Sequence, residues 1–193
     1  MPQLIWRFLC FVLLHSLFAA DFVKAWTAVH WPSSRRWYRL IYNILAVTSF
    51  WWVMSALPGS PRLYAAPAPA LPVLFGIQMV ALLLLCRCAA QTGLGDLLGF
   101  RQLRHDNETP PTVVTTGCYR HVRHPQYSLA VILLVATPEM SVNFAILTLL
   151  TILYFIWGGY IEEHRLLSVC GDEYRHYRMT TPMFIPRLRR NRR

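Results

Sequence analysis

Two clusters of charged and polar residues in the second half of the chain have the types and spacing to bind a charged ligand. The first is the run Gly117-Cys118-Tyr119-Arg120-His121-Val122-Arg123-His124-Pro125-Gln126-Tyr127, and the second begins with Glu162-Glu163 after an apolar stretch. Adjacent carboxylates at the end of an apolar helix are costly to keep there, so they indicate a functional site with a charged partner. With Arg123 and His124 as partners, they predict a small cage for a zwitterionic ligand.

Composition places these clusters in a membrane protein. The chain has 193 residues, of which 55% are hydrophobic and 15% charged, and its mean hydropathy is +0.34. These values are typical of a polytopic membrane protein. The net charge of +10 does not indicate nucleic-acid binding, because the basic residues lie in short loops between apolar runs.

The five cysteines predict neither a disulfide framework nor a metal site. Their number is odd and no Cys-x-x-Cys occurs. Cys86 and Cys88 are two residues apart on an expected helix, so they should face different directions. We interpret all five as reduced or lipid-buried thiols: Cys10, Cys86, Cys88, Cys118 and Cys170.

Five apolar segments can form membrane helices. They are Leu4–Ala20, Leu40–Leu57, Leu71–Ala89, Pro125–Thr137 and Val142–Tyr160. A bilayer core needs about 20 helical residues, so the fourth segment is short for a full crossing. It either starts deep in the interface or is one arm of a hairpin with the fifth segment that does not fully cross alone. Pro125 suits the first turn of its helix, and Pro138 suits the hairpin turn.

The predicted fold is therefore an all-α integral membrane protein of about five transmembrane helices. We expect a single membrane domain over residues 1–193. Residues 1–90 hold three membrane helices, and residues 91–193 hold the first cluster, the helical hairpin and a helical tail. The first segment lacks a convincing cleavage site, so we interpret it as a retained helix and not a signal peptide.

The distribution of Lys and Arg predicts the orientation. The loops carry four, one, five, none and eight basic residues in chain order, beginning after the first segment. This alternation places the N-terminus outside, and the first cluster and the C-terminal tail in the cytoplasm. Both clusters then share one face of the membrane, which we predict to be a bacterial inner (plasma) membrane.

The tail and the loops have simpler roles. Residues 161–177 have helical character, and Gly171 can end a first helix or allow a bend. The basic end, 187–193, suits contact with anionic lipid. The stretch 58–72 contains five prolines and is expected to be an outer loop.

The motif order resembles a known superfamily. Gly-x-Tyr at 117–119 and Arg-His-Pro-x-Tyr at 123–127 precede the hairpin, and Glu-Glu-x-x-Leu at 162–166 and Gly-x-x-Tyr-x-x-Tyr at 171–177 follow it. This order is similar to that of the integral-membrane methyltransferases, which include isoprenylcysteine carboxyl methyltransferases and phospholipid N-methyltransferases. The likeness is greatest to bacterial methanethiol S-methyltransferases, through His15-Ser16, Gly99-Phe100-Arg101-Gln102, Ala136-Thr137-Pro138 and Met140. The chain is expected to lack an extra N-terminal segment of those enzymes.

The resemblance implies an enzyme that uses S-adenosylmethionine. The residues that it places around the cofactor are Val114, Gly117, Tyr119, His124, Pro125, Tyr127, Glu162 and Glu163. The carboxylates can accept charge-assisted hydrogen bonds from the cofactor's ammonium. Arg123 can fork onto its carboxylate, while Tyr119, Tyr127 and Leu166 can form walls for the adenosine.

Two of these residues also have expected roles beside the reacting atoms. A thiol acceptor must lose its proton, because the thiolate is the nucleophile; His124 is the candidate to assist, with Arg123 beside it. Gly117 would let the backbone approach the cofactor. The simpler interpretations are a topogenic Arg123, a helix-start His124 and interfacial tyrosines.

The acceptor class has more than one interpretation. Leu129 stands where the family often has glycine, and it narrows the space beside the hairpin, which favours a small thiol over a lipophilic acceptor. Besides the substrate, the only predicted partner is the lipid bilayer; no nucleic acid or protein partner is predicted. The alternatives are an isoprenylcysteine-type carboxyl methyltransferase, a non-catalytic bundle, and a haem-binding membrane protein related to zeta-carotene isomerase or nitrite-reductase-associated factors, in which His15 and His124 would be axial ligands. Otherwise His15 is expected to make a hydrogen bond within the bundle.

Overall fold

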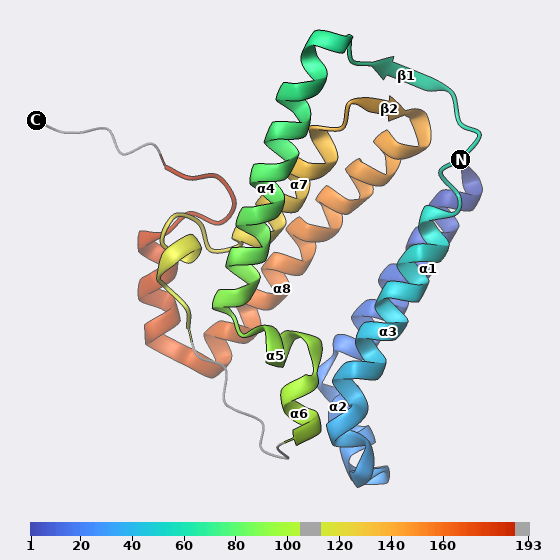
Figure 1. Ribbon diagram of the computed structural model, residues 1–193. Helices are drawn as coiled ribbons and strands as arrows, with labels where there is room; N and C mark the ends of the chain where they lie inside the picture. Colours follow the sequence, from blue (N-terminus) through green and yellow to red (C-terminus); the bar gives the residue numbers. More distant parts are fainter. Residues whose placement is uncertain (105–112, 188–193) are drawn as a thin grey trace, which may run out of the picture. The chain divides into compact units, whose positions relative to one another are not determined.

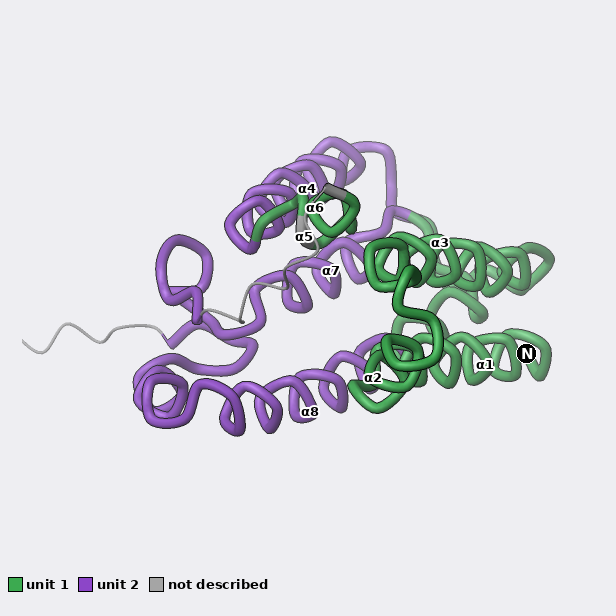
Figure 2. The backbone as a smooth tube through the Cα atoms, turned by 90° about the horizontal axis from the view of Figure 1, so that it is seen from below, with its two compact units in different colours: residues 1–65, 93–109, 139–150 green, residues 66–92, 110–138, 151–193 purple. Residues whose placement is uncertain are grey.

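Helices make up most of the protein, as its apolar segments predict. The computed structural model describes residues 1–104 and 113–187 (Figure 1). The chain divides into two compact units that interleave along the sequence (Figure 2): unit 1 is 1–65, 93–109 and 139–150, and unit 2 is 66–92, 110–138 and 151–193. The single membrane domain expected from the sequence stays a prediction.

Unit 1 is built on two long helices that polar side chains join. Its helices are α1 (Pro2–Ala19), α2 (Asp21–His30), η1 (Pro32–Ser34), α3 (Arg35–Met54), α5 (Leu94–Leu98) and α6 (Phe100–Arg104). Arg7 on α1 donates to Ser55 Oγ at 2.7 Å and to the Trp52 carbonyl at 3.1 Å. The His15 Nε2 and Tyr42 Oη atoms are hydrogen-bonded at 2.6 Å. The bundle hydrogen bond expected for His15 is therefore present.

A two-stranded antiparallel sheet in unit 1 departs from the all-α prediction. Its strands are β1 (Arg62–Ala65) and β2 (Glu139–Ser141). Arg62 pairs with Ser141 and Tyr64 with Met140, and the register shifts between Arg62 and Tyr64. The strands have four and three residues, too few for a period-two pattern to stand out between prolines. The proline-rich loop and the hairpin turn are thus paired.

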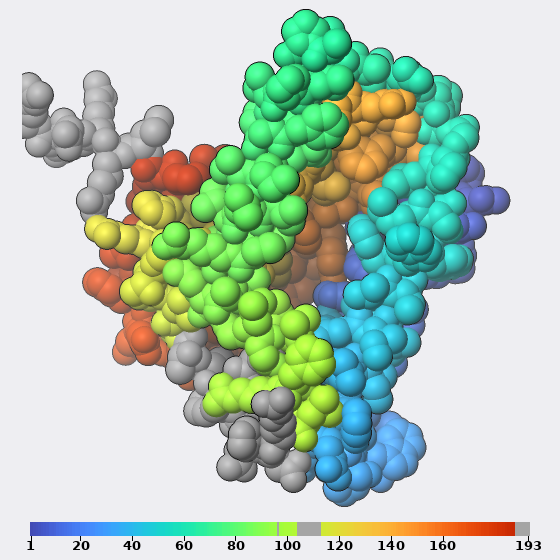
Figure 3. Space-filling model, viewed as in Figure 1, coloured from blue at the N-terminus to red at the C-terminus, as the bar shows by residue number. Residues whose placement is uncertain are grey.

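Unit 2 packs one long helix against a short one. Its elements are η2 (Ala68–Ala70), α4 (Leu71–Gln91), η3 (Gly117–Arg120), α7 (Pro125–Val135) and α8 (Val142–Thr180) from residue 151 onward. Gln78 on α4 donates to the Leu133 carbonyl on α7 at 3.2 Å. The outer side of α4 stays uncovered (Figure 3) and carries exposed Val73, Met79 and Leu83. Such an apolar surface on a long helix suits contact with lipid.

Helix α8 bends sharply near its end. Gly171 has φ 56° and ψ −125°, which breaks the helical geometry inside α8. Only glycine adopts this region at little cost. Figure 1 shows the last part of α8 turned away from the direction of the first part. The predicted bend at Gly171 is confirmed, and it buries Tyr174 and Tyr177 in unit 2.

Within residues 1–104 and 113–187, three helices are long and apolar enough to cross a membrane. They are Pro2–Ala19, Ala68–Gln91 and Val142–Thr180. The helix at Pro125–Val135 is apolar but shorter, as expected for the fourth segment. Helix α3 has 20 residues but is not among these candidate spans. A helical protein with membrane-spanning segments is therefore supported, while the count of five crossings remains a prediction.

Candidate active site

The two charged clusters expected to form a cage meet in unit 2. Arg123 Nε donates to Glu163 Oε1 at 2.7 Å, and the side chains are only 9% and 3% exposed. The residues are 40 positions apart in the sequence. A buried charge requires a partner of opposite sign. Arg123 therefore stabilises the buried carboxylate of Glu163.

His124 lies between both carboxylates. Its Nε2 atom is 3.3 Å from Glu163 Oε1, and its Nδ1 atom is 3.5 Å from Glu162 Oε2. Burial alone would lower the pKa of His124, but the hydrogen bonds and charges of Glu162 and Glu163 outweigh burial and raise it above the ordinary 6.5. Both ring nitrogens of His124 thus face carboxylate oxygens. An axial haem ligand needs one ring nitrogen directed at the iron, so this arrangement does not favour the haem alternative.

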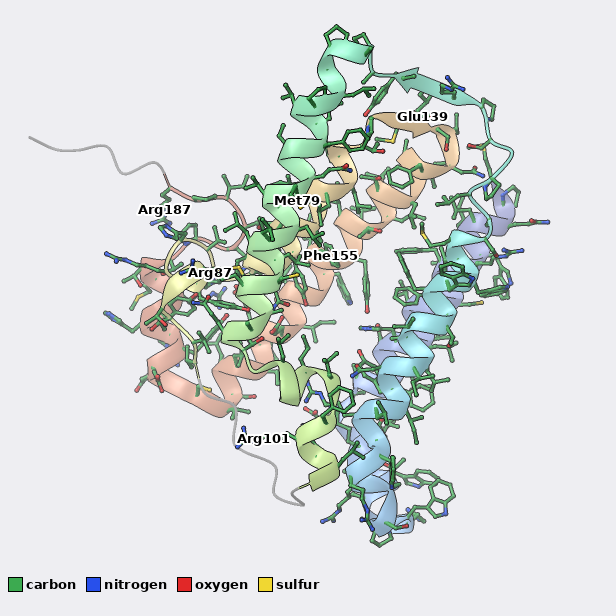
Figure 4. The ribbon with its side chains drawn as sticks, viewed as in Figure 1. Met79, Arg87, Arg101, Glu139, Phe155 and Arg187 are labelled. Carbon is green, nitrogen blue, oxygen red and sulfur yellow. A yellow bond between two sulfur atoms is a disulfide. The ribbon has the colours of Figure 1, made fainter. Side chains whose placement is uncertain are left out.

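Three aromatic rings form a continuous stack beside the carboxylates. The Tyr127 ring is parallel to His124 at 5.3 Å and to Phe155 at 4.7 Å, between ring centroids. The Tyr127 hydroxyl donates to Glu162 Oε2 at 3.2 Å. Phe155, labelled on α8 in Figure 4, did not emerge from the sequence. Its position two turns before Glu162 on α8 was the available signal.

The segment after α8 fixes the backbone of the first cluster. The amides of Arg123 and His124 donate to the carbonyls of Pro182 and Met183 at 2.9 and 3.0 Å. The Ser128 hydroxyl donates to the Phe184 carbonyl at 2.7 Å. These bonds hold the Arg-His-Pro turn in place. Sequence reasoning missed this segment, because backbone pairing leaves no residue-type signature.

Arg123 is also held by the end of α8. Its Nη1 group donates to the Arg178 carbonyl at 3.0 Å and to the Thr181 carbonyl. The last carbonyls of a helix have no partner within the helix, and a cation satisfies them well. In the described site, Arg123 therefore bridges Glu163 to the end of α8.

One oxygen of Glu163 has no hydrogen bond from the residues that the structure describes. This atom, Oε2, is buried, and the Nε atom of Arg178 lies 3.3 Å away as an ion-pair partner. A buried acceptor of this kind favours a further donor. Arg178 is the second site residue that the sequence did not indicate.

Gly117 and Cys118 are fastened to the end of α4. The Cys118 amide donates to Gln91 Oε1 at 3.0 Å. Gly117 has φ 59°, and a Cβ there would lie 1.7 Å from Gln91 Nε2. The positive φ therefore favours glycine at this position, where it packs against the Gln91 amide, and the approach to a cofactor expected from the sequence stays a prediction.

A disulfide corrects the prediction of reduced thiols. Cys88 and Cys118 are bonded, with Cα atoms 5.7 Å apart. Cys88 is buried, whereas Cys86 is exposed, so the two do face different directions as predicted. The prediction was wrong because a sequence separation of 30 residues across a loop gives no spacing signal.

Tyr119 joins this loop to the rest of unit 2. Its hydroxyl accepts from Gln126 Nε2 at 3.2 Å, and its carbonyl accepts from the Tyr177 hydroxyl. Burial, followed by the charge of Glu162, raises the pKa of Tyr119 to about 12. Tyr119 therefore remains a neutral hydrogen-bonding group beside the acidic pair.

The remaining predicted residues occupy their expected elements. Pro125 is buried at the first position of α7. Val114 is half-buried in the segment before η3, and Leu166 is half-buried on α8, one turn after Glu162. The structure thus brings Arg123, His124, Tyr127, Glu162 and Glu163 together. The binding roles assigned from the sequence stay predictions.

The helical fold and this cluster define a membrane protein with a charged, partly buried site. Residues 74–167 match the model of the isoprenylcysteine carboxyl methyltransferase (ICMT) family, a range that includes the Arg-His-Pro motif and both carboxylates. The chain is therefore a membrane methyltransferase, and its residues 74–167 are similar to this family.

Several curated relatives share one name. The methanethiol S-methyltransferase of Pseudomonas deceptionensis is 29% identical over 94% of this chain and 71% of its own length. That of Crocosphaera subtropica is 28% identical over 91% and 71%. Methanethiol S-methyltransferase 1 of Bradyrhizobium diazoefficiens is 27% identical over 91% and 63%. No solved structure shows significant similarity to the chain.

Gly117→Ala is expected to disturb the loop before the Arg-His-Pro motif. Alanine is strained at φ 59°, and its Cβ would overlap the Gln91 amide. We expect a loss of about 1–3 kcal/mol in stability, measured by thermal unfolding in detergent. Gly117→Ala combined with Gln91→Ala should recover the part due to overlap. A Gly117→Ala protein as stable as the wild type would contradict this packing.

The charge of His124 predicts a pH-dependent stability. Because its folded-state pKa is raised, its contribution is fully present below the unfolded value of about 6.5 and is lost as pH rises through the folded value. His124→Gln should therefore lose less thermal stability than the wild type as the pH rises above about 6.5. The control is His121→Gln, which removes an exposed histidine. Parallel pH profiles for wild type and His124→Gln would contradict the assignment.

Proposed function

We propose that the cluster in unit 2 binds S-adenosylmethionine and that the enzyme methylates a small thiol. The observation that carries the proposal is Glu163, a buried carboxylate with Arg123 and His124 on one oxygen; its other oxygen has an ion-pair partner in Arg178 but no hydrogen bond from the described residues. This acceptor fits the cofactor, because an ammonium group is the charged donor that a buried carboxylate oxygen favours.

The side chains around Glu163 suggest how the cofactor would be held. Glu162 and Glu163 would accept from the ammonium, and the stacked Tyr127 and Phe155 rings offer an aromatic surface. In this arrangement Arg123 is chiefly a positioning residue, since it already bridges Glu163 to the end of α8. The other expected lining residues are Val114, Gly117, Tyr119, Pro125 and Leu166.

When bound, S-adenosylmethionine supplies an activated methyl group on a sulfonium. The protein must keep the site dry and orient the acceptor. A thiol acceptor must lose its proton first. His124 can take that proton only as a neutral ring, and its two carboxylate neighbours oppose this state. Engagement of those carboxylates by an ammonium would lower the pKa of His124 and so prepare it as the base.

Two observations favour a small thiol as acceptor. The curated relatives are named as methanethiol S-methyltransferases. Leu129 on α7, which is half-buried, adds bulk beside the hairpin. The net exchange converts the thiol into its methyl thioether and the donor into S-adenosylhomocysteine, with release of one proton.

Labelled methyl transfer tests this acceptor assignment. Detergent-solubilised protein with methyl-labelled S-adenosylmethionine should label methanethiol and other small alkyl thiols, and label a farnesylated cysteine analogue poorly. Leu129→Gly should raise labelling of the farnesylated compound. Efficient labelling of that compound by the wild type, with none on small thiols, would contradict the thiol assignment and leave a methyltransferase of another acceptor.

We further propose five crossings in a bacterial inner membrane, with the N-terminus outside and the site in the cytoplasm. The count of basic residues supports this orientation. Reporter fusions at Ser60 and at the C-terminus should give opposite signals, the first external and the second cytoplasmic. An external signal from the C-terminal fusion would contradict a cytoplasmic cofactor site.

A further inference from the structure

A disulfide and a hydrogen bond connect η3 to the end of α4. The Cys88–Cys118 disulfide is covalent, and the bond from the Cys118 amide to Gln91 Oε1 is 3.0 Å long. Cys88 and Gln91 are three residues apart, so they lie on one face of the helix. Thiol–disulfide exchange can break the disulfide, whereas it leaves the hydrogen bond from the Cys118 amide unchanged.

The loop held in this way leads directly into the candidate site. Tyr119 follows Cys118, and its hydroxyl accepts from Gln126, which lies between Pro125 and Tyr127 of the site. Its carbonyl accepts from Tyr177 behind the bend of α8. A displacement of Cys118 would therefore also move Tyr119 and disturb its hydrogen bonds with Gln126 and Tyr177.

We propose that the Cys88–Cys118 disulfide is a redox-sensitive clamp that sets cofactor affinity by holding η3 and Tyr119 in place. This inference rests on the proposed function. Loss of the bond would remove the covalent link from Cys118 to α4 across a sequence separation of 30. The hydrogen bond from the Cys118 amide to Gln91 would then hold Cys118 at α4.

The chemistry that opens the clamp is thiol–disulfide exchange. A small thiolate attacks Sγ of Cys118, which is half-buried, forms a mixed disulfide and releases the buried Cys88 as a thiolate. A second thiolate attacks the mixed disulfide and releases Cys118, so two electrons pass to the protein and the reductant becomes its own disulfide. In the proposed cytoplasmic location, disulfides are characteristically redox-sensing, and the proposed substrate class includes such thiols.

The test compares oxidised and phosphine-reduced full-length protein in detergent. Tagging with a maleimide polymer after denaturation should modify three cysteines in the oxidised protein, Cys10, Cys86 and Cys170, and all five in the reduced protein. Calorimetric titration with S-adenosylmethionine should give binding about 5–30-fold weaker for the reduced protein. Cys118→Ser and Cys88→Ala should bind like the reduced wild type under both conditions.

Cys86→Ser is the matched control, since Cys86 is an exposed free cysteine two residues from Cys88. It should keep the full difference between oxidised and reduced affinity. Equal affinities of the oxidised and reduced wild type would overturn the clamp and leave the proposed function standing, as would five tags on the oxidised protein. Absence of binding by either form would overturn the proposed function and the clamp together.

Discussion

Glu163→Gln is expected to weaken S-adenosylmethionine binding by roughly 30-fold or more. The substitution keeps the shape of the side chain but removes the charge that faces Arg123 at 2.7 Å and His124 at 3.3 Å. Loss of one partner of a buried, hydrogen-bonded charge pair costs about 2–5 kcal/mol. Titration calorimetry on detergent-solubilised protein measures the effect directly.

Two acidic residues on the same helix provide controls for this result. The Glu162 side chain is 50% exposed, so Glu162→Gln should cause a smaller loss. Glu173 is exposed beyond the bend, and Glu173→Gln should bind like the wild type. Normal binding by both Glu162→Gln and Glu163→Gln would show that the carboxylate cage is not the cofactor site.

Arg123→Lys is expected to weaken cofactor binding by about tenfold or more, because lysine cannot reproduce the planar fork of arginine. Arg123 uses Nε for Glu163 and Nη1 for the carbonyls of Arg178 and Thr181. A single ammonium cannot span these acceptors, so Glu163 would lose its fixed position. The thermal midpoint should fall as well, while membrane insertion persists because the positive charge remains.

Arg120→Lys separates this effect from a general loss of arginine. Arg120 lies three residues earlier and is exposed, so its replacement changes neither the basic residue count nor the Glu163 pair. It should bind the cofactor with wild-type affinity. An Arg123→Lys protein with unchanged affinity and stability would favour a purely topogenic role for Arg123.

The features predicted well from the sequence are those decided by the free-energy cost of placing a single residue or segment in its surroundings. Long apolar runs give helices α1, α4 and α8, because a helix satisfies its backbone hydrogen bonds within the segment in lipid. Gly171 was expected to end a first helix or allow a bend, because glycine is the residue that most easily leaves helical geometry, and its φ of 56° shows the bend. The pairing of Arg123 with Glu163 was also accessible, since an isolated charge at an apolar helix end is too costly to keep.

Features that depend on tertiary pairing were not accessible. The Cys88–Cys118 bond, the short sheet and the backbone bonds from Pro182 and Met183 join positions far apart in sequence. Their residues carry no periodicity or motif of their own. Phe155 was counted only as one apolar helix residue, and its stacking on Tyr127 depends on how α7 and α8 pack.

The most direct measurement is an experimental structure of the protein with S-adenosylhomocysteine, whose ammonium and adenosine match those of the cofactor. We predict that the ligand's amino nitrogen lies within hydrogen-bond distance, about 2.7–3.2 Å, of a carboxylate oxygen of Glu162 or Glu163. The adenosine should lie against residues from Val114 to Tyr127 and Leu166. A ligand bound elsewhere in the chain, with Glu163 still paired only to Arg123, His124 and Arg178, would contradict the central claim.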